Sequence, residues 1–374
     1  MTSNLTAVER RRLTSLRLAA QGITGARRAG AAGIVRSMLA IQGQDLPGAR
    51  WSIGLRGAGL TDREVGAAFD AAEIVRSWPM RGTLHVTAAE DMGWMLGLMA
   101  GRTVRATARR RGELGLTDAD LARARDAAVA VLEGGRALGR EELLDAFVAH
   151  DVAVDAQRGY HLLGYLAQTG VIVQGPIAGT RQAFVLLDEW VPAPRRLAGD
   201  EALGELAGRY YRSHGPATEP DLARWSGLPL GDVRRGLAVA GDRVTHLEVA
   251  GMRYHLAPEV LDAGAADGPS DPGAGPVVHL LPGFDEYILG YLDRTAALGP
   301  EHAQAVVPGN NGMFLATVVV DGQVVGTWKR TQRARHALIE PSPFAGPLGA
   351  EVVVGLAAAA QAYGSFLVTE GRLA

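Results

Sequence analysis

Apolar residues recur at helical spacing in several short segments of the chain, and each group of such segments is followed by two strings in which apolar and polar residues alternate. The clearest group begins with EALGELAGRYYRSHG, which we expect to end at Gly215 as a left-handed helix cap. Two more short helices, ATEPDLARWSG and PLGDVRRGLAVAG, precede the alternating strings RVTHLEV and MRYHLA. Three helices and a β-hairpin predict a winged helix.

The same order of elements occurs twice more, upstream. One copy opens at Thr117 and Asp120, which have capping-box spacing, and its first helix runs to Glu133. It continues through REELLDAFVAH and AQRGYHLLGYLAQTG into the strands VIVQGP and RQAFVLL. The first copy predicts helices over 8–21, 26–41 and 62–71, then the strands EIVRSW and TLHVTA.

The C-terminal part has a different pattern. The segment AGAADGPSDPGAGP, between Ala263 and Pro276, predicts a linker or exposed loop, and the strings beyond it predict strands and a small barrel. The sequence therefore predicts an α+β fold of three tandem winged helices over residues 1–112, 113–195 and 196–263. A linker and a β-rich part follow over 264–374.

Composition narrows the class of protein. The chain of 374 residues has 47% hydrophobic and 21% charged residues, as expected for a globular protein of several modules. It has no cysteine, which excludes disulfides, thiolate metal sites and cysteine nucleophiles and fits a reducing compartment. The N-terminus lacks a signal-peptide core, and the apolar run VVVGLAAAA is too short to span a bilayer. We expect a cytoplasmic protein that does not bind a membrane.

The net charge of −2 conceals a segregation of charge. Nine arginines and two acids lie in residues 1–60, and residues 101–112 contain five arginines and no acid. Winged helices with basic segments favour nucleic acid as the partner, although such modules also bind proteins. The phosphate-binding loop with lysine, the metalloprotease helix and the zinc deaminase signature are missing.

Two glutamines interrupt an apolar pattern at MLAIQGQDLPGARW. Gln42 continues the stripe that ends at Met38, so its amide is predicted to point inward or into a cleft. If Gly43 lets the chain extend, the side chains of Gln42 and Gln44 fall on the same side. Two interpretations remain at this point: the amides cap the helix by bonding loop carbonyls, or they hold a reacting molecule.

Four strings of the sequence, in order, carry a family resemblance: AIQGQDLPGARWSIGLR, RSWPMRGTLHVTAAED, LLPGFDEYILGYLDR and VVVDGQVVGTWKR. They resemble the winged-helix DNA glycosylase family typified by AlkZ and YcaQ, over almost the whole chain. The resemblance implies a concave, positive DNA cleft and catalytic roles for Gln42 and Gln44. The glutamine pair is similar to the AlkZ branch, associated with self-resistance to azinomycin, since the YcaQ branch has aspartate at the second position.

The resemblance also implies an activity: hydrolysis of the N-glycosidic bond of N7-alkylated purines in double-stranded DNA, including unhooking of interstrand crosslinks. Alkylation at N7 makes the purine a good leaving group, so the remaining task is to hold a water beside C1′, which amide oxygens can do. We expect no cofactor and no metal, a monomer associated with the nucleoid, and a monofunctional reaction. Lys329 is the only lysine, and Schiff-base chemistry needs an amine.

Further residues are assigned by the same resemblance. Asp45 is a candidate supporting base, with helix or loop capping as the alternative. The turn VVPGNNGMF, with Asn310 and Asn311, is our candidate for a DNA-inserting β-hairpin, and an ordinary turn is the alternative. Our candidates for holding DNA phosphates are Arg330, Arg333 and Arg335, and an exposed basic tail to the strand is the alternative.

His85 is expected to be structural. The rival to a glycosylase is a non-catalytic winged-helix regulator, although neither a dimerisation heptad nor an effector module is evident. A protein-binding scaffold would leave the glutamine pair and the arginine segments unexplained.

Overall fold

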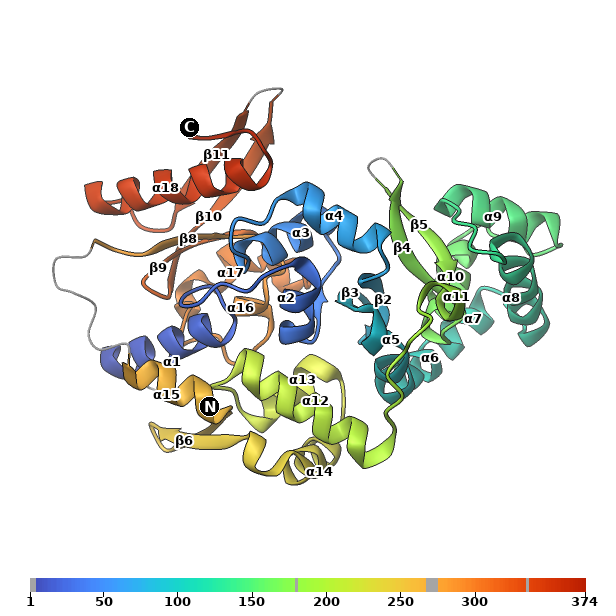
Figure 1. Ribbon diagram of the computed structural model, residues 1–374, viewed down its shortest axis with the longest axis horizontal. Coiled ribbons are helices and arrows are strands. Elements are labelled where there is room, and N and C mark those ends of the chain that lie inside the picture. Colours follow the sequence, from blue (N-terminus) through green and yellow to red (C-terminus); the bar gives the residue numbers. More distant parts are fainter. Residues whose placement is uncertain (1–4, 179–180, 267–274, 334–335) are drawn as a thin grey trace. The chain divides into compact units, whose positions relative to one another are not determined.

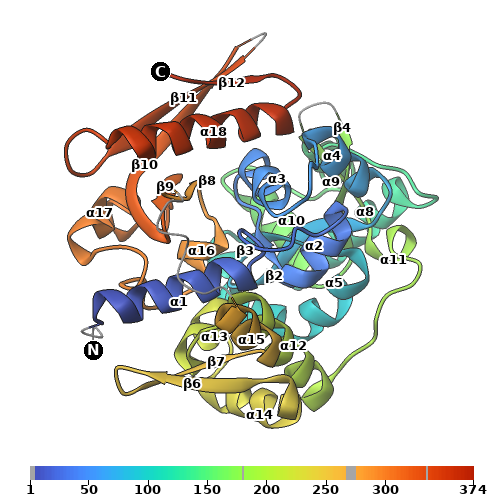
Figure 2. The same cartoon turned by 60° about the vertical axis from the view of Figure 1, so that its left-hand side comes forward.

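The computed structural model describes residues 5–178, 181–266, 275–333 and 336–374, and the fold mixes α-helices with β-sheets (Figures 1 and 2). Contacts divide the chain into two compact units. Unit 1 comprises Met1–Val65 and Gly204–Ala374, and unit 2 comprises Gly66–Leu203. Helices α4 (Asp62–Asp70) and α12 (Gly199–His214) cross the two boundaries. The predicted segment 1–112 therefore contributes to both units.

Unit 2 contains two hairpins and a set of helices. Its elements are β2 (Ile74–Met80), β3 (Thr83–Ala88), α5 (Ala89–Met95), the π-helical turn η1 (Leu96–Ala100), α6 (Gly101–Ala106), α7 (Ala108–Glu113), α8 (Asp118–Leu132), α9 (Arg140–Ala149), α10 (Arg158–Gln168), β4 (Ile172–Ala178), β5 (Arg181–Leu186) and α11 (Leu187–Trp190). Both hairpins are antiparallel, and they join in the order β3-β2-β4-β5 where Arg76 pairs with Gln174. The two predicted hairpins of the first and second copies thus share one sheet, which the sequence pattern did not predict.

The helices of the second copy follow their local signals. Thr117 Oγ1 accepts from the Asp120 backbone N–H at 3.2 Å, and Asp120 Oδ2 accepts from the Thr117 N–H at 2.8 Å. The capping box is therefore confirmed, and α8 ends at Leu132, one residue before the predicted end at Glu133. Apolar residues of α8, α9 and α10 form one core cluster, in which Leu132, Phe147 and Leu162 are fully buried.

The N-terminal part of unit 1 packs against elements distant in the sequence. It contains α1 (Ala7–Ala20), α2 (Ala31–Met38), β1 (Ile41–Gln42) and α3 (Leu46–Leu55). The third copy adds α13 (Glu219–Ser226), α14 (Leu230–Ala240), the 3-10 turn η2 (Gly241–Arg243), β6 (Thr245–Val249), β7 (Met252–Leu256) and α15 (Pro258–Ala266). Leu13 and Leu16 of α1 share a core cluster with Leu256 and Val260, so α1 lies beside α15 (Figures 1 and 2).

The helix cap predicted at Gly215 is wrong. Helix α12 ends at His214, but Gly215 does not have a positive φ, so it is not a left-handed cap. Glycine is needed there for space instead, because an added Cβ would lie 2.3 Å from the Tyr211 carbonyl oxygen. Gly227, which ends α13 with φ 75°, does have the left-handed conformation.

The C-terminal strands form a half-barrel sheet, so the β-barrel-like part that the sequence predicts is present but not closed. Its members are β8 (Val278–Leu281), β9 (Thr317–Val320), β10 (Gln323–Gln332), β11 (His336–Pro343) and β12 (Glu370–Leu373). They lie in the order β12-β11-β10-β9-β8, and the end strands do not pair with each other in the described chain. Helix α18 (Ala350–Phe366) contacts both end strands, β8 and β12, and also β11 (Figure 2).

Helix α18 contains the apolar run VVVGLAAAA. Leu356 and Ala360 of this run are buried, whereas Val353 and Val354 are exposed. In the described parts of the chain, no helix is both long and apolar enough to cross a membrane.

The segment between β8 and β9 is made of short helical turns. It contains α16 (Glu286–Leu289), the 3-10 turn η3 (Pro300–His302), α17 (Ala303–Val306) and the 3-10 turn η4 (Pro308–Asn310). The β-hairpin predicted in VVPGNNGMF is therefore wrong: Val306 ends a helix, and Gly309 and Asn310 take positive φ angles inside a turn. The antiparallel strand pairs that follow this segment are β9–β10 and β10–β11.

Candidate functional site

The loop that carries the glutamines begins with a strained turn. Helix α2 was predicted to continue to Ile41, but it ends at Met38. Leu39 has φ 67° and ψ −54°, and the Ala40 N–H donates to the Met38 carbonyl at 2.8 Å, which makes a γ-turn centred on Leu39. Such an angle in a non-glycine residue costs about 1–3 kcal/mol and persists only where the surroundings enforce it. The chain is thus redirected into β1 before it reaches Gln42.

Gln42 is buried, and its amide oxygen lacks a protein partner. The residue is 5% exposed, and Oε1 accepts no hydrogen bond in the part of the chain that the structure describes. A buried acceptor in this state costs about 1–3 kcal/mol, so natural sites of this kind are filled by a water or a ligand. The C-cap of α2 is Leu39, whose N–H donates to Arg36. The interpretation that Gln42 caps this helix is therefore wrong.

Gln44 and Asp45 lie in a different environment from Gln42. Gln44 is exposed, in a bend, and Asp45 occupies the N-cap position of α3. The Asp45 side chain makes no capping hydrogen bond, although Gly48 leaves room for it: an added Cβ at Gly48 would lie 2.6 Å from Asp45 Oδ2. The two amides of the pair therefore differ in burial, which the extended geometry expected across Gly43 did not predict.

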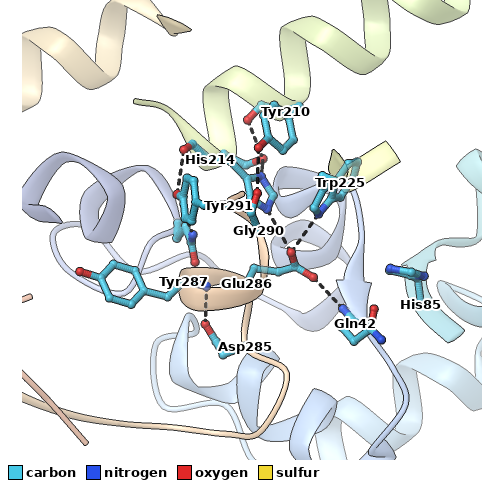
Figure 3. Close-up of polar contacts among 12 residues, drawn as sticks. Gln42, His85, Tyr210, His214, Trp225, Asp285, Glu286, Tyr287, Gly290 and Tyr291 are labelled. Atoms are coloured by element: carbon cyan, nitrogen blue, oxygen red, sulfur yellow. Dashed lines mark hydrogen bonds and ion pairs between the residues drawn. The ribbon is translucent and has the colours of Figure 1, made fainter. Parts of the chain in front are cut away.

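A buried carboxylate holds the main chain at the first glutamine (Figure 3). Glu286, the first residue of α16, is 0% exposed. Its Oε1 accepts the backbone N–H of Gln42 at 2.9 Å, and its Oε2 accepts the indole N–H of Trp225 at 2.9 Å. His214 Nε2 lies 3.4 Å from the same Oε2. The next residue in the network is Ser213, whose hydroxyl lies 2.8 Å from His214 Nδ1.

The preceding residue, Asp285, holds the other side of the glutamine loop. Both of its oxygens accept from the Arg56 guanidinium at 2.9 Å, and Ser52 of α3 donates to Oδ2 at 2.7 Å. Burial alone would raise the pKa of Asp285, but the Arg56 charge and these hydrogen bonds lower it below its usual value. The Asp285–Glu286 pair therefore ties both β1 and α3 to the start of α16.

The acidic pair was not assigned a role from the sequence. Its string, LLPGFDEYILGYLDR, was used only as a mark of the family. Two adjacent acids inside such an apolar segment were a signal, because buried carboxylates require partners. Their partners in the N-terminal part of the chain lie more than two hundred positions away, and the separation between Gln42 and Glu286 is 244.

The predicted DNA-contacting residues lie on two separate elements of unit 1. Arg330 and Arg333 are exposed on β10 and at its end, and Arg335 lies outside the described residues. Arg330 donates to the Tyr363 hydroxyl at 2.6 Å. Asn310 and Asn311 are exposed at η4, where Asn311 Oδ1 accepts from the Met313 N–H at 2.9 Å.

His85 of unit 2 has the surroundings of a structural residue. It is fully buried in β3, and its Nδ1 lies 2.8 Å from the Thr83 carbonyl while its Nε2 lies 3.2 Å from Arg81 Nη2. In the described ranges, no three histidine, aspartate or glutamate side chains are arranged to hold a metal ion.

Comparisons with known proteins match most of the chain. A family model described as "DNA glycosylase AlkZ-like" matches residues 35–366. A protein of Streptomyces sahachiroi named "Interstrand DNA cross-link repair glycosylase" is 29% identical over 315 residues, which are 80% of this chain and 82% of that protein. The solved structure of the Streptomyces sahachiroi DNA glycosylase AlkZ is similar with a TM-score of 0.79 and 26% identity, over 97% of each chain.

Proposed function

Because the chain belongs to the AlkZ-like DNA glycosylase family, we propose that it hydrolyses the N-glycosidic bond of N7-alkylated purines in duplex DNA, with Gln42 and Gln44 as the catalytic residues. Membership of an enzyme family argues against the alternative of a non-catalytic regulator. The observation that carries the proposed mechanism is the Oε1 atom of Gln42, a buried acceptor that has no hydrogen-bond partner among the residues that the structure describes.

In the proposed reaction, the protein needs mainly to position a water molecule, because the alkylated base leaves readily. An N7-alkylated purine is cationic, so it leaves as a neutral base when it takes the electron pair of its bond to C1′. Water then adds its oxygen to C1′ and releases a proton to solvent or to Asp45, the candidate supporting base. Gln42 Oε1 would accept a hydrogen bond from this water, and the water would be positioned before the reaction begins.

The proposed substrates include interstrand crosslinks, since the relative from Streptomyces sahachiroi carries that activity in its name. A crosslinked base cannot enter a deep pocket, because the other strand is attached to it. An exposed Gln44 beside a buried Gln42 suits a base that stays near the duplex. Self-resistance to a DNA-alkylating natural product is the biological role that we propose.

We further propose how the DNA is held. The three groups of helices and hairpins, over 1–112, 113–195 and 196–263, would act as winged helices that form a concave surface for the duplex. The β10–β11 ribbon replaces the segment around Asn310 as our candidate for the inserted hairpin, because its strands carry Lys329 and Arg330 and Arg333 follows β10. The protein would act as a monomer on nucleoid DNA in the cytoplasm.

Release of free base tests the proposed function. The protein would be incubated with a duplex that contains one N7-methylguanine, and the products separated by chromatography. We expect free N7-methylguanine and an intact strand with one abasic site. If no base is released from this duplex or from a crosslinked one, the proposed function is wrong.

A further inference from the structure

We propose that Glu286 is a positioning residue for base excision, which acts by holding the backbone of Gln42; this inference rests on the proposed function. The Glu286 carboxylate accepts the Gln42 N–H at 2.9 Å and lies 244 positions away in the sequence. It therefore connects the catalytic loop to a separate part of unit 1 (Figure 3). A hydrogen bond to an ionised acceptor is among the stronger ones in proteins.

The glutamine loop needs such an anchor because it has little regular structure. Strand β1 spans two residues, and it follows the strained γ-turn at Leu39. A leucine with a positive φ is held in place only when its surroundings over-determine it. Leu39 is itself fully buried, which fixes one end of the loop, and the Glu286 carboxylate fixes the chain three residues later.

Glu286 has a rigid setting of its own. The indole N–H of Trp225 donates to Oε2 at 2.9 Å, and the His214 ring, stacked on Tyr210 at 4.7 Å, approaches the same oxygen. Gly290 makes room for this ring, since an added Cβ there would lie 2.8 Å from His214 Cδ2. The carboxylate is thus fixed by contacts from α12, α13 and α16.

Glu286 does not act on the substrate itself. The residue is 0% exposed, and each carboxylate oxygen already accepts an N–H group. A water could not reach it without opening the core of unit 1. Its effect on the reaction must pass through the position of Gln42, whose Oε1 would hold the water. Small displacements of a positioned group are known to reduce rates strongly.

The test is a double-mutant cycle between Glu286→Gln and Gln42→Ala. Glutamine has the shape of glutamate but offers one acceptor, so either the Gln42 N–H or the Trp225 N–H must face an NH₂ group. We expect E286Q to lower the single-turnover excision rate about tenfold or more, by the strength of a charge-assisted hydrogen bond. Duplex affinity should not change. Amide hydrogen exchange in the peptide that contains Gln42 should become faster.

The cycle separates positioning from general loss of stability. If Glu286 acts through Gln42, E286Q should have no further effect on the residual rate of the Q42A variant. The matched control is Tyr287→Phe, which removes the buried hydrogen bond from the next residue of α16 to the Gly322 carbonyl, on the side away from Gln42 (Figure 3). We expect Y287F to lower the melting temperature and to leave the excision rate unchanged.

Two results would overturn the inference. One is an excision rate of E286Q equal to that of the wild type, and the other is a loss of rate on E286Q substitution that is equally large in the wild-type and Q42A proteins. If E286Q does not fold, Glu286→Asp enters the same cycle with the same criteria, since it draws the carboxylate back by one methylene. Failure of the proposed function is a different outcome, because the wild-type protein would then release no base. Hydrogen exchange at Gln42 would still test the anchor in that case.

Discussion

Replacement of Gln42 by leucine should stabilise the protein while it abolishes base excision. The amide oxygen of Gln42 is buried and has no partner in the described ranges of the chain, which costs about 1–3 kcal/mol in the folded state. Leucine has a similar volume and no polar atom, and the change of shape costs less than about 1.5 kcal/mol. We therefore expect a net gain of about 1 kcal/mol in the free energy of unfolding. Stabilisation on loss of a polar group is typical of catalytic residues.

Gln21 provides the matched control. It is also a buried glutamine of unit 1, but its amide is fully used: Oε1 accepts from Arg56 at 2.7 Å, and Nε2 donates to the Tyr291 hydroxyl at 3.1 Å. Gln21→Leu leaves a buried guanidinium without one of its acceptors, so it should lose about 2 kcal/mol or more. The same substitution is thus expected to raise the free energy of unfolding at Gln42 and to lower it at Gln21.

Thermal melting followed by circular dichroism compares the two variants with the wild type. We expect a higher melting temperature for Q42L and a lower one for Q21L, measured at the same pH and salt. If Q42L melts as low as Q21L, the Gln42 amide is a satisfied structural group, and the argument from its unpartnered oxygen fails.

Three further predictions concern basic side chains: three arginines, one histidine and the lysine. Neutralising Arg330, Arg333 and Arg335 together should weaken binding to any duplex and lower the slope of log K against log salt by about 2–3; an unchanged slope would show that they do not face DNA. Burial and two nearby arginines lower the pKa of His279 to about 4, so the unfolded chain binds the extra proton below pH 6.5. Stability should fall by about 3 kcal/mol between pH 6.5 and 4, and His279→Gln should flatten the melting profile over that range. Borohydride should trap no covalent adduct with abasic DNA, and an adduct lost in Lys329→Ala would contradict a monofunctional reaction.

Elements with local signals were predictable from the sequence. The capping box of Thr117 and Asp120 and the alternating strands of the hairpins depend on neighbouring residues. The end of α2 was not predictable, because leucine favours helices and nothing near Leu39 indicates a positive φ. That conformation depends on the buried environment of the folded chain.

Only the contiguous part of the candidate site was predictable from the sequence, because the rest depends on the folded chain. The glutamine pair is contiguous and therefore visible, but its burial pattern depends on the turn at Leu39. Glu286 and Asp285 act on the loop from across the fold, so one sequence indicates only that two acids stand in an apolar segment. The turn around Asn310 was misread because proline, glycine and asparagine favour turns in hairpins and between helices alike.

The proposed function depends on the glutamine pair. The decisive measurement is the single-turnover rate of N7-methylguanine release for Gln42→Ala, Gln44→Ala and the double variant, with duplex affinity and melting temperature measured alongside. We expect each single variant to lose most of the rate at nearly unchanged affinity, and the double variant to be little slower than the slower single, because both amides would hold the same water. Excision near the wild-type rate by the double variant would contradict the account.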